Sequence, residues 1–216
     1  MILLELFAGT RSISKSFEEH GHKTYSIEWD KNFENIDLYE DINKVTSNDI
    51  IKLCGGKPDI IWASFDCTTY SIAGVHHHRK YKDNEPVAIS EYAKQCDKTN
   101  IHVLDLIKEL KPKYYFIENP VGCLRKMKFM QDLPRYTITY CQYGDKRMKP
   151  TDIWTNYINP NFKLPCKNGA PCHERAPRGS RTGTQGLKNA RIRSVIPKEL
   201  CDYIVKICEE GDEHGL

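Results

Sequence analysis

The sequence lacks the features of a membrane or exported protein. None of its apolar runs approaches the roughly 18 residues that a membrane span needs. Residues 1–6 lack a basic start and contain the acid Glu5, so no signal peptide is visible. The nine cysteines are odd in number and scattered. We therefore expect free thiols in a reducing compartment, with the cytoplasm as the location.

The sequence also lacks a large excess of either charge. Its formal net charge is +3, which by itself predicts no polyanionic partner. The basic residues are unevenly distributed, because the only acid within residues 163–193 is Glu174. The basic side chains there are Lys163, Lys167, His173, Arg175, Arg178, Arg181, Lys188, Arg191 and Arg193. This segment is a candidate phosphate-contacting surface, although a solvated loop would have the same composition.

Apolar runs alternate with amphipathic segments in the first half of the chain. We expect strands at residues 2–6, 23–27, 60–65 and 114–117, with helices at 12–20, 48–54 and 89–110. Strands at 136–140 and 152–157 then follow each other closely, and a helix at 197–208 closes the chain. This order predicts an α/β fold, a doubly wound mixed sheet with an antiparallel edge. The length suits one domain with at most a small appendage.

A candidate nucleotide cradle lies at the first two strand ends. The first strand is followed by Phe7-Ala8-Gly9-Thr10 and a helix, whose free amides favour anionic groups. Roughly 20 residues later, Glu28 ends the second strand, where an acid can accept ribose hydroxyls. Trp29 beside it could stack on a purine. One glycine is a weak signal and Glu28 alone could be a surface residue, so the prediction depends on the combination.

Two reactive side chains follow buried strands. Cys67 ends an apolar run, where ligands collect in open α/β sheets, although cysteine is also a common core residue. Glu118 ends another such run and suits either proton donation or a structural hydrogen bond. The polar residues 73–83 could form a mobile loop that closes over a substrate. The three adjacent histidines within them are not expected to converge on one metal ion.

These candidates occur in a defined order along the chain. The series is Phe7-Ala8-Gly9, Glu28-Trp29, Asp41-Ile42, Cys67 with Ser71, Glu118-Asn119, Gln142 with Arg147, and Arg193-Ser194-Val195. It resembles the ordered motifs of the cytosine-C5 DNA methyltransferases nearly end to end. The resemblance implies a Rossmann-like fold dependent on S-adenosylmethionine, with double-stranded DNA as the partner.

The resemblance implies a role for each motif. The residues that would bind S-adenosylmethionine are Phe7, Ala8, Gly9, Thr10, Glu28, Trp29, Asp41, Ile42 and Ser194. Cys67 would be the catalytic nucleophile at C6 of a flipped cytosine, Glu118 would protonate N3, and Arg147 would lie near the base or its phosphate. The residues that we expect to contact nucleic acid are Ser71, Arg79, Lys149, Arg178 and Arg181.

The chain departs from the family in two respects. Asp66 stands where members usually have proline, and its charge should raise the pKa of the neighbouring thiol. The family also inserts a large target-recognition region before its last motif, whereas only residues 156–190 are available here. We therefore expect a catalytic domain at 1–155, a small basic recognition segment at 156–190, and a helical segment at 191–216 that completes the catalytic domain. Short phage-encoded members look similar.

Three possible metal ligands fall inside the reduced recognition segment. Cys166, Cys172 and His173 could bind zinc as a staple for a loop that has little core. A fourth ligand is not identifiable from the sequence, and the spacing matches no recognised finger. Free surface thiols, with no bound metal, are therefore the preferred interpretation.

Three other functions stay open. Asn119-Pro120 is suggestive of an amino-methyltransferase acting on adenine N6 or cytosine N4, but the second proline and the aromatic residue that grip the base are missing. The substrate could instead be RNA, because the family includes tRNA-modifying relatives. An inactive relative that binds cofactor or DNA is the third alternative, and Asp66 makes it conceivable.

Overall fold

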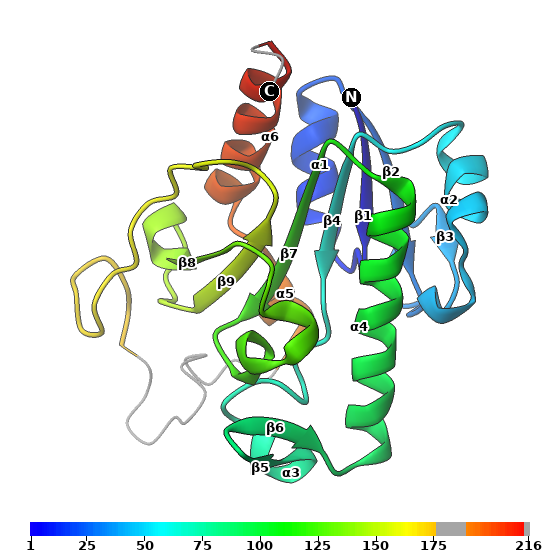
Figure 1. Ribbon diagram of the computed structural model, residues 1–216. Coiled ribbons are helices and arrows are strands. Elements are labelled where there is room, and N and C mark those ends of the chain that lie inside the picture. Colours follow the sequence, from blue (N-terminus) through cyan, green and yellow to red (C-terminus); the bar gives the residue numbers. More distant parts are fainter. Residues whose placement is uncertain (176–188, 214–216) are drawn as a thin grey trace.

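A seven-stranded mixed sheet forms the centre of the computed structural model, which describes residues 1–175 and 189–213 (Figure 1). Its strand order is β3-β2-β1-β4-β7-β9-β8. The strands are β1 (Ile2–Leu6), β2 (Lys23–Glu28), β3 (Leu38–Tyr39), β4 (Ile60–Ser64), β7 (Tyr114–Pro120), β8 (Arg135–Thr139) and β9 (Pro150–Thr155). Strand β9 runs opposite to the other six strands, so its pairs with β7 and β8 are antiparallel and the remaining pairs are parallel. The doubly wound mixed sheet is confirmed, with the antiparallel strand one position inside the edge.

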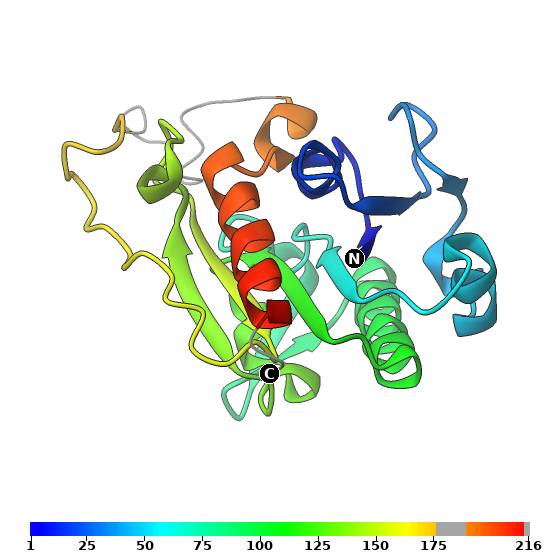
Figure 2. The same cartoon turned by 90° about the horizontal axis from the view of Figure 1, so that it is seen from above.

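Helices cover both faces of the sheet (Figure 2). The α-helices are α1 (Ser12–Glu19), α2 (Ser47–Cys54), α3 (Val75–His78), α4 (Glu91–Leu110), α5 (Ala190–Ser194) and α6 (Lys198–Glu213). Short 3-10 turns are η1 (Ile42–Lys44), η2 (Cys123–Lys126), η3 (Lys128–Met130) and η4 (Tyr140–Tyr143). Among the described residues, no helix combines the length and the apolar character that crossing a membrane requires.

The central strand of the sheet, β4, is buried on both faces. In β4, Ile60 and Trp62 pack with α1 and α6, whereas Ile61 and Ala63 pack with α2 and α4. Side chains alternate across a strand, so a strand that is apolar throughout needs cover on both sides. The continuous apolar run therefore explains why β4 is central, and it leaves the strand's carboxyl end as the place where a ligand can reach it.

One polar side chain lies inside this apolar frame. Glu5 of β1 is buried, and its carboxyl group accepts the backbone amides of Ser14 at 2.8 Å and Ile13 at 3.4 Å. These amides belong to the first turn of α1, where backbone N–H groups lack helical partners. Burial raises the pKa of Glu5 to about 7, against the opposing effect of the Ser14 bonds.

Residues 73–83 contain a short helix, α3, and a strand, β5, where their polarity suggested a loop. After α3, β5 (Arg79–Lys82) pairs antiparallel with β6 (Glu85–Ala88). Asp83 and Asn84 form the connection, with φ of 50° and 64°. Such positive values are tolerated best by short polar side chains, which is why these residues favour tight hairpin turns. The Asp-Asn pair was the available sequence signal for this hairpin.

Arg79 stabilises the hairpin from within, so the expectation that it contacts nucleic acid is wrong. Its side chain is fully buried, and its guanidinium meets the two carboxylate oxygens of Asp97 on α4 at 2.7 and 3.1 Å. It also donates to the Thr69 carbonyl at 3.0 Å and stacks 4.1 Å from the Tyr70 ring centre. The Tyr70 hydroxyl donates to the same carboxylate at 2.6 Å. This network ties the segment after β4 to α4.

Replacing Arg79 with methionine should destabilise the protein, because Asp97 then loses its cation in a mostly buried position. Breaking a buried pair from one side costs about 3–5 kcal/mol, and partial exposure of Asp97 favours the lower end. Chemical denaturation measures this, with the exposed neighbour Lys80→Met as control and an expected change within about 0.5 kcal/mol. An Arg79→Met protein of normal stability but weakened DNA binding would restore the discarded role.

Candidate active site

The sequence candidates follow the carboxyl ends of five parallel strands, which meet at one edge of the sheet. Gly9 follows β1, Glu28 ends β2 and Asp41 follows β3, while Cys67 follows β4 and Glu118 lies in the last part of β7. The order of the strands reverses between β1 and β4, which is where open α/β sheets bind ligands. The cradle residues therefore lie on one side of this point and the reactive side chains on the other.

Glu28 organises the turn after β1. Its Oε2 accepts the Gly9 amide at 3.0 Å, and its Oε1 accepts the amides of Trp29 and Asp30 at 2.9 and 3.1 Å. Gly9 has a φ of 48°, which favours glycine. A buried carboxylate held by three amides is fixed in place. Because Oε2 accepts only one of these three bonds, it can still accept a ligand hydroxyl.

Trp29 contrasts with the other tryptophans of the protein. Its side chain is 70% exposed, whereas Trp62 and Trp154 are at most 1% exposed in the core. A large apolar ring beside a fixed carboxylate presents a flat face and an anionic acceptor together. A purine nucleoside has the complementary pair, a flat base and a ribose.

The remaining cradle candidates have structural contacts of their own. The Asp41 carboxylate accepts the Asn43 amide at 3.0 Å and caps η1, and Ile42 packs in the core. Ser194 of α5 donates to the Arg191 carbonyl at 2.9 Å. A cavity of about 720 Å³ connects Gly9 and Thr10 with η4 and the junction of α5 and α6. The cavity is lined by Val195, next to Ser194, whereas Ser194, Glu28 and Trp29 are not among its lining residues.

Cys67 lies in a tight turn that Asp66 stabilises. The Cys67 carbonyl accepts the amides of Tyr70 and Ser71 at 3.1 and 2.8 Å. Asp66 accepts the Thr68 amide at 2.8 Å through Oδ1, and the Tyr92 hydroxyl through Oδ2. A proline at this position could not accept either bond. Asp66 is therefore part of how this chain builds the turn.

The raised pKa of Cys67 favours the protonated thiol over the reactive thiolate. Burial raises its pKa to about 11, and the charges of Glu118 and then Asp66 act in the same direction. The ammonium of Lys149 opposes them. The effect expected for Asp66 is present, but it ranks behind burial and behind Glu118. Roughly one thiol in ten thousand is then ionised at pH 7.

Glu118 is buried between an aromatic hydroxyl and a cation. Its Oε1 accepts the Tyr140 hydroxyl at 2.9 Å, and the Lys149 ammonium lies 3.9 Å from the same oxygen. Lys149 also lies 4.3 Å from the centre of the Tyr140 ring, and burial lowers its pKa. The sequence suggested that Lys149 contacts nucleic acid, and the structure places its charge beside Glu118. Tyr140 was missed, because a tyrosine at a strand end gives no specific signal.

Arg147 is held beside Lys149 by a local ion pair. Its Nε lies 2.9 and 3.0 Å from the two Asp145 oxygens. The side chains of Arg147 and Lys149 both donate to the Arg193 carbonyl, at 3.3 and 3.1 Å. The last motif of the series therefore packs directly against the Arg147 motif. Asp145 was not recognised from the sequence as the partner of Arg147.

Ser71 shapes the loop after Cys67. Its hydroxyl accepts the Gly74 amide at 3.2 Å, and its backbone bridges to Gly122. A Cβ at Gly122 would lie 2.2 Å from the Tyr70 carbonyl oxygen, so the close approach of these two backbone segments requires glycine.

Two other residues that we expected to contact nucleic acid, Arg178 and Arg181, lie outside the described residues. The possible zinc ligands Cys166, Cys172 and His173 do come together, at a separate place beside η4.

The reaction of Cys67 with iodoacetamide should rise about tenfold per pH unit from pH 7 to 9, since only the thiolate reacts. At each pH, Asp66→Asn should react faster than the wild type because it removes a negative charge. Lys149→Met should react slower because it removes the opposing cation. Peptide mass spectrometry separates Cys67 from the other cysteines. Equal rates in all three proteins would contradict this electrostatic description.

The geometry agrees with comparisons to known proteins. Residues 1–140 match the family described as C-5 cytosine-specific DNA methylase. Over 232 aligned residues the chain is 25% identical to a Frog virus 3 (isolate Goorha) protein named "Probable DNA (cytosine-5)-methyltransferase". The alignment covers 96% of this chain and all of that protein.

Two solved structures share the fold. One is an E. coli prophage protein with the description "putative DNA modification methyltransferase", with TM-score 0.52, 14% identity, and 72% of this chain and 46% of that chain covered. The other is the S. pombe Dnmt2 methyltransferase, with TM-score 0.51, 13% identity and coverages of 76% and 51%. The matched region thus spans about half of each. The sheet is that of a Rossmann-like methyltransferase, and the family match extends over most of the chain, so the chain belongs to the C-5 cytosine-specific DNA methylase family.

Proposed function

We propose that this protein transfers a methyl group from S-adenosylmethionine to C5 of cytosine in double-stranded DNA. The observation that carries the proposal is the pairing of β4 with β7, in which Ser64 lies opposite Glu118. This register brings the Cys67 turn and the Glu118 carboxyl to neighbouring strand ends. The family match and the name of the Frog virus 3 relative support cytosine in DNA as the substrate.

The cradle fits S-adenosylmethionine. Glu28 would accept the ribose hydroxyls, Trp29 would stack on the adenine, and the Gly9 turn would lie along the cofactor. Asp41 and Ile42 would border the adenine, and the hollow towards Ser194 would take the amino-acid end. When bound, S-adenosylmethionine supplies an electrophilic methyl group. The fixed Glu28 carboxylate supports this assignment, because its orientation needs no rearrangement on binding.

Cys67 and Glu118 would activate the base. C5 of cytosine is a poor nucleophile, and addition of the Cys67 sulfur to C6 pushes an electron pair towards C5. Glu118 would deliver a proton to N3 and so accept the charge that develops there. Because Tyr140 engages Oε1, we assign Oε2 to this contact. Once C5 carries its new substituent, loss of the C5 proton returns the electron pair that expels Cys67.

The high pKa of the Cys67 thiol is compatible with this addition. The step would balance if the Cys67 proton passes to the Glu118 carboxylate and from there to N3, because no net proton is then exchanged with solvent. The Glu118 charge is one of the causes that disfavour the thiolate. Protonation of Glu118 would remove that charge and ease ionisation of Cys67. Lys149 is the nearby cation that opposes the increase in the pKa of Cys67.

The recognition of DNA would lie outside this buried centre. We assign residues 1–155 to catalysis, 156–190 to a reduced recognition segment, and 191–216 to completing the catalytic domain. The helix α6 packs on α1, which supports the last assignment. Arg178 and Arg181 would supply phosphate contacts. Reaching C6 requires the cytosine to leave the duplex stack.

The cofactor assignment is tested most directly at Trp29. Because Trp29 is mostly exposed, Trp29→Ala should leave thermal stability nearly unchanged while weakening S-adenosylmethionine binding roughly tenfold through lost stacking. Trp29→Phe should recover part of the affinity. Calorimetric titration measures both, with Ile158→Ala as the control, since Ile158 is 74% exposed and away from the cradle. Wild-type affinity in Trp29→Ala would remove the stacking role.

The covalent step is tested with DNA that contains 5-fluorocytosine. Fluorine at C5 cannot leave as a proton does, so enzyme and DNA should stay joined on a denaturing gel in the presence of cofactor. The adduct should vanish in Cys67→Ala and form about 10²–10⁴-fold more slowly in Glu118→Gln. A parallel RNA substrate tests the other nucleic acid. Full methylation activity in Cys67→Ala would instead point to transfer to an exocyclic amine.

A further inference from the structure

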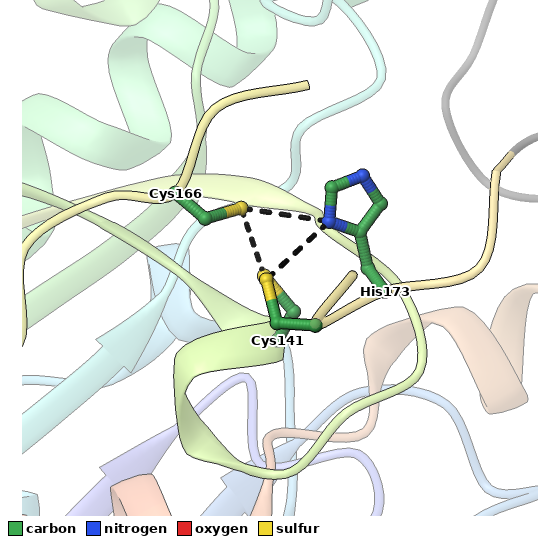
Figure 3. Close-up of side chains that lie close together, drawn as sticks. Cys141, Cys166 and His173 are labelled. Carbon is green, nitrogen blue, oxygen red and sulfur yellow. Dashed lines mark hydrogen bonds between the residues drawn. The ribbon is translucent and has the colours of Figure 1, made fainter. Parts of the chain in front are cut away.

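Four potential metal ligands converge beside η4, away from the cysteine and carboxyl pair. They are Cys141 of η4 together with Cys166, Cys172 and His173 of the loop that follows β9. Figure 3 shows Cys141, Cys166 and His173 directed towards one another. The sequence suggested only the last three, because Cys141 lies 25 positions before Cys166 and belongs to a different segment. The fold supplies the fourth ligand.

Three separations between the ligand atoms match a tetrahedral metal site, and all four atoms lie within 4.8 Å of one another. The Sγ atoms of Cys141 and Cys172 are 3.7 Å apart, and the His173 Nδ1 lies 3.6 Å from the Sγ of both Cys166 and Cys172. Bonds of about 2.3 Å to sulfur and 2.0–2.1 Å to nitrogen at tetrahedral angles give about 3.8 and 3.6 Å. Cys141 and Cys166 are 3.1 Å apart, too far for a disulfide of about 2.05 Å. These two sulfur atoms would have to move slightly apart to bind the same metal ion.

The part of the loop that contributes three ligands has few other contacts. Residues 156–163 pack through the Phe162 ring against Tyr136 and Tyr203, but residues 164–175 contain no helix, strand or buried residue, and Leu164 is 83% exposed. The loop is joined to the sheet by single hydrogen bonds, such as Cys166 N–H to Thr139 Oγ1 at 3.0 Å and Glu174 N–H to the Lys146 carbonyl at 2.9 Å. Segments without a core commonly use a metal in its place.

We propose that Cys141, Cys166, Cys172 and His173 bind one zinc ion as a closed structural site. Three sulfur ligands and one imidazole suit zinc, and four protein ligands leave no position for a catalytic water. Binding replaces three thiol protons, so three thiolates, a neutral imidazole and Zn²⁺ carry a net charge of −1. The proposal concerns binding alone and does not depend on the methyl-transfer proposal.

Zinc at this position would fix two elements of the protein relative to one another. Cys141 follows Tyr140, whose hydroxyl holds Glu118, and His173 lies near the end of the described loop, three residues before residue 176. The ion would thus join the catalytic edge to the recognition segment, residues 156–190, in which three of its ligands lie. Coordination through Nδ1 places the remaining ring proton on Nε2. The Gly169 amide, now 3.3 Å from Nε2, would then have to turn away.

The test begins with the metal content of the full chain, purified without chelators and analysed by mass spectrometry. We expect one zinc per chain, and a value well below one in Cys166→Ser and in Cys172→Ser. Cys67→Ser is the matched control and should keep its zinc. Substitution with Co²⁺ should give the intense visible absorption of a four-coordinate thiolate site. Wild-type protein that neither contains nor takes up zinc would overturn the proposal.

Two further variants keep the test valid if a serine variant folds poorly. His173→Cys preserves the ligand number and should retain zinc, whereas His173→Ala should bind it at least about tenfold more weakly. Equal zinc affinity in His173→Ala and wild type would contradict the four-ligand site. So would peptide mapping of freshly purified protein that finds Cys141 and Cys166 joined in a disulfide without metal. These measurements need neither DNA nor S-adenosylmethionine, so their failure is separate from failure of the methyl-transfer proposal.

Discussion

The register between β4 and β7 is the constraint on which the candidate site depends. Side chains alternate along a strand, so a slip of one residue would turn Glu118 to the other face of the sheet. The Asn119 side chain reinforces the register by donating to the Phe65 carbonyl, just before the Cys67 turn, at 2.8 Å. The positions of the proposed nucleophile Cys67 and the proposed acid Glu118 thus depend on the pairing of two apolar strands and on the turn that follows β4.

Three cationic side chains around Cys67 and Glu118 already interact with acidic side chains of the protein. Arg79 is bound by Asp97, Arg147 by Asp145, and Lys149 lies beside Glu118. Such buried charges shape the local electrostatics and hold segments in place, whereas phosphate contacts require accessible cations. These three cations therefore serve the fold, and contacts to DNA phosphates would have to come from other residues.

The sequence predicted those parts of the fold that depend on local patterns. Continuous apolar runs identified β1, β4 and β7, and Glu28 was correctly placed at the end of β2. The errors concern residues whose environment is set by distant partners. Arg79 was expected to be exposed because it is charged, yet Asp97, 18 positions later, neutralises it inside the protein. Cys141 could not be linked to Cys166 for the same reason, since the fold alone brings η4 and the loop together.

The buried Glu5 couples folding to proton uptake. Its pKa of about 7 lies above the ordinary 4.5, so near pH 6 the folded chain holds a proton that the unfolded chain has released. By linkage, this group makes the free energy of unfolding fall as the pH rises from about 4.5 to about 7, and leaves it lower above that. Glu5 holds the first turn of α1, which directly follows the Gly9 turn. The contribution of Glu5 to the free energy of unfolding, made next to the Gly9 turn, is therefore larger in mildly acidic solution than in alkaline solution.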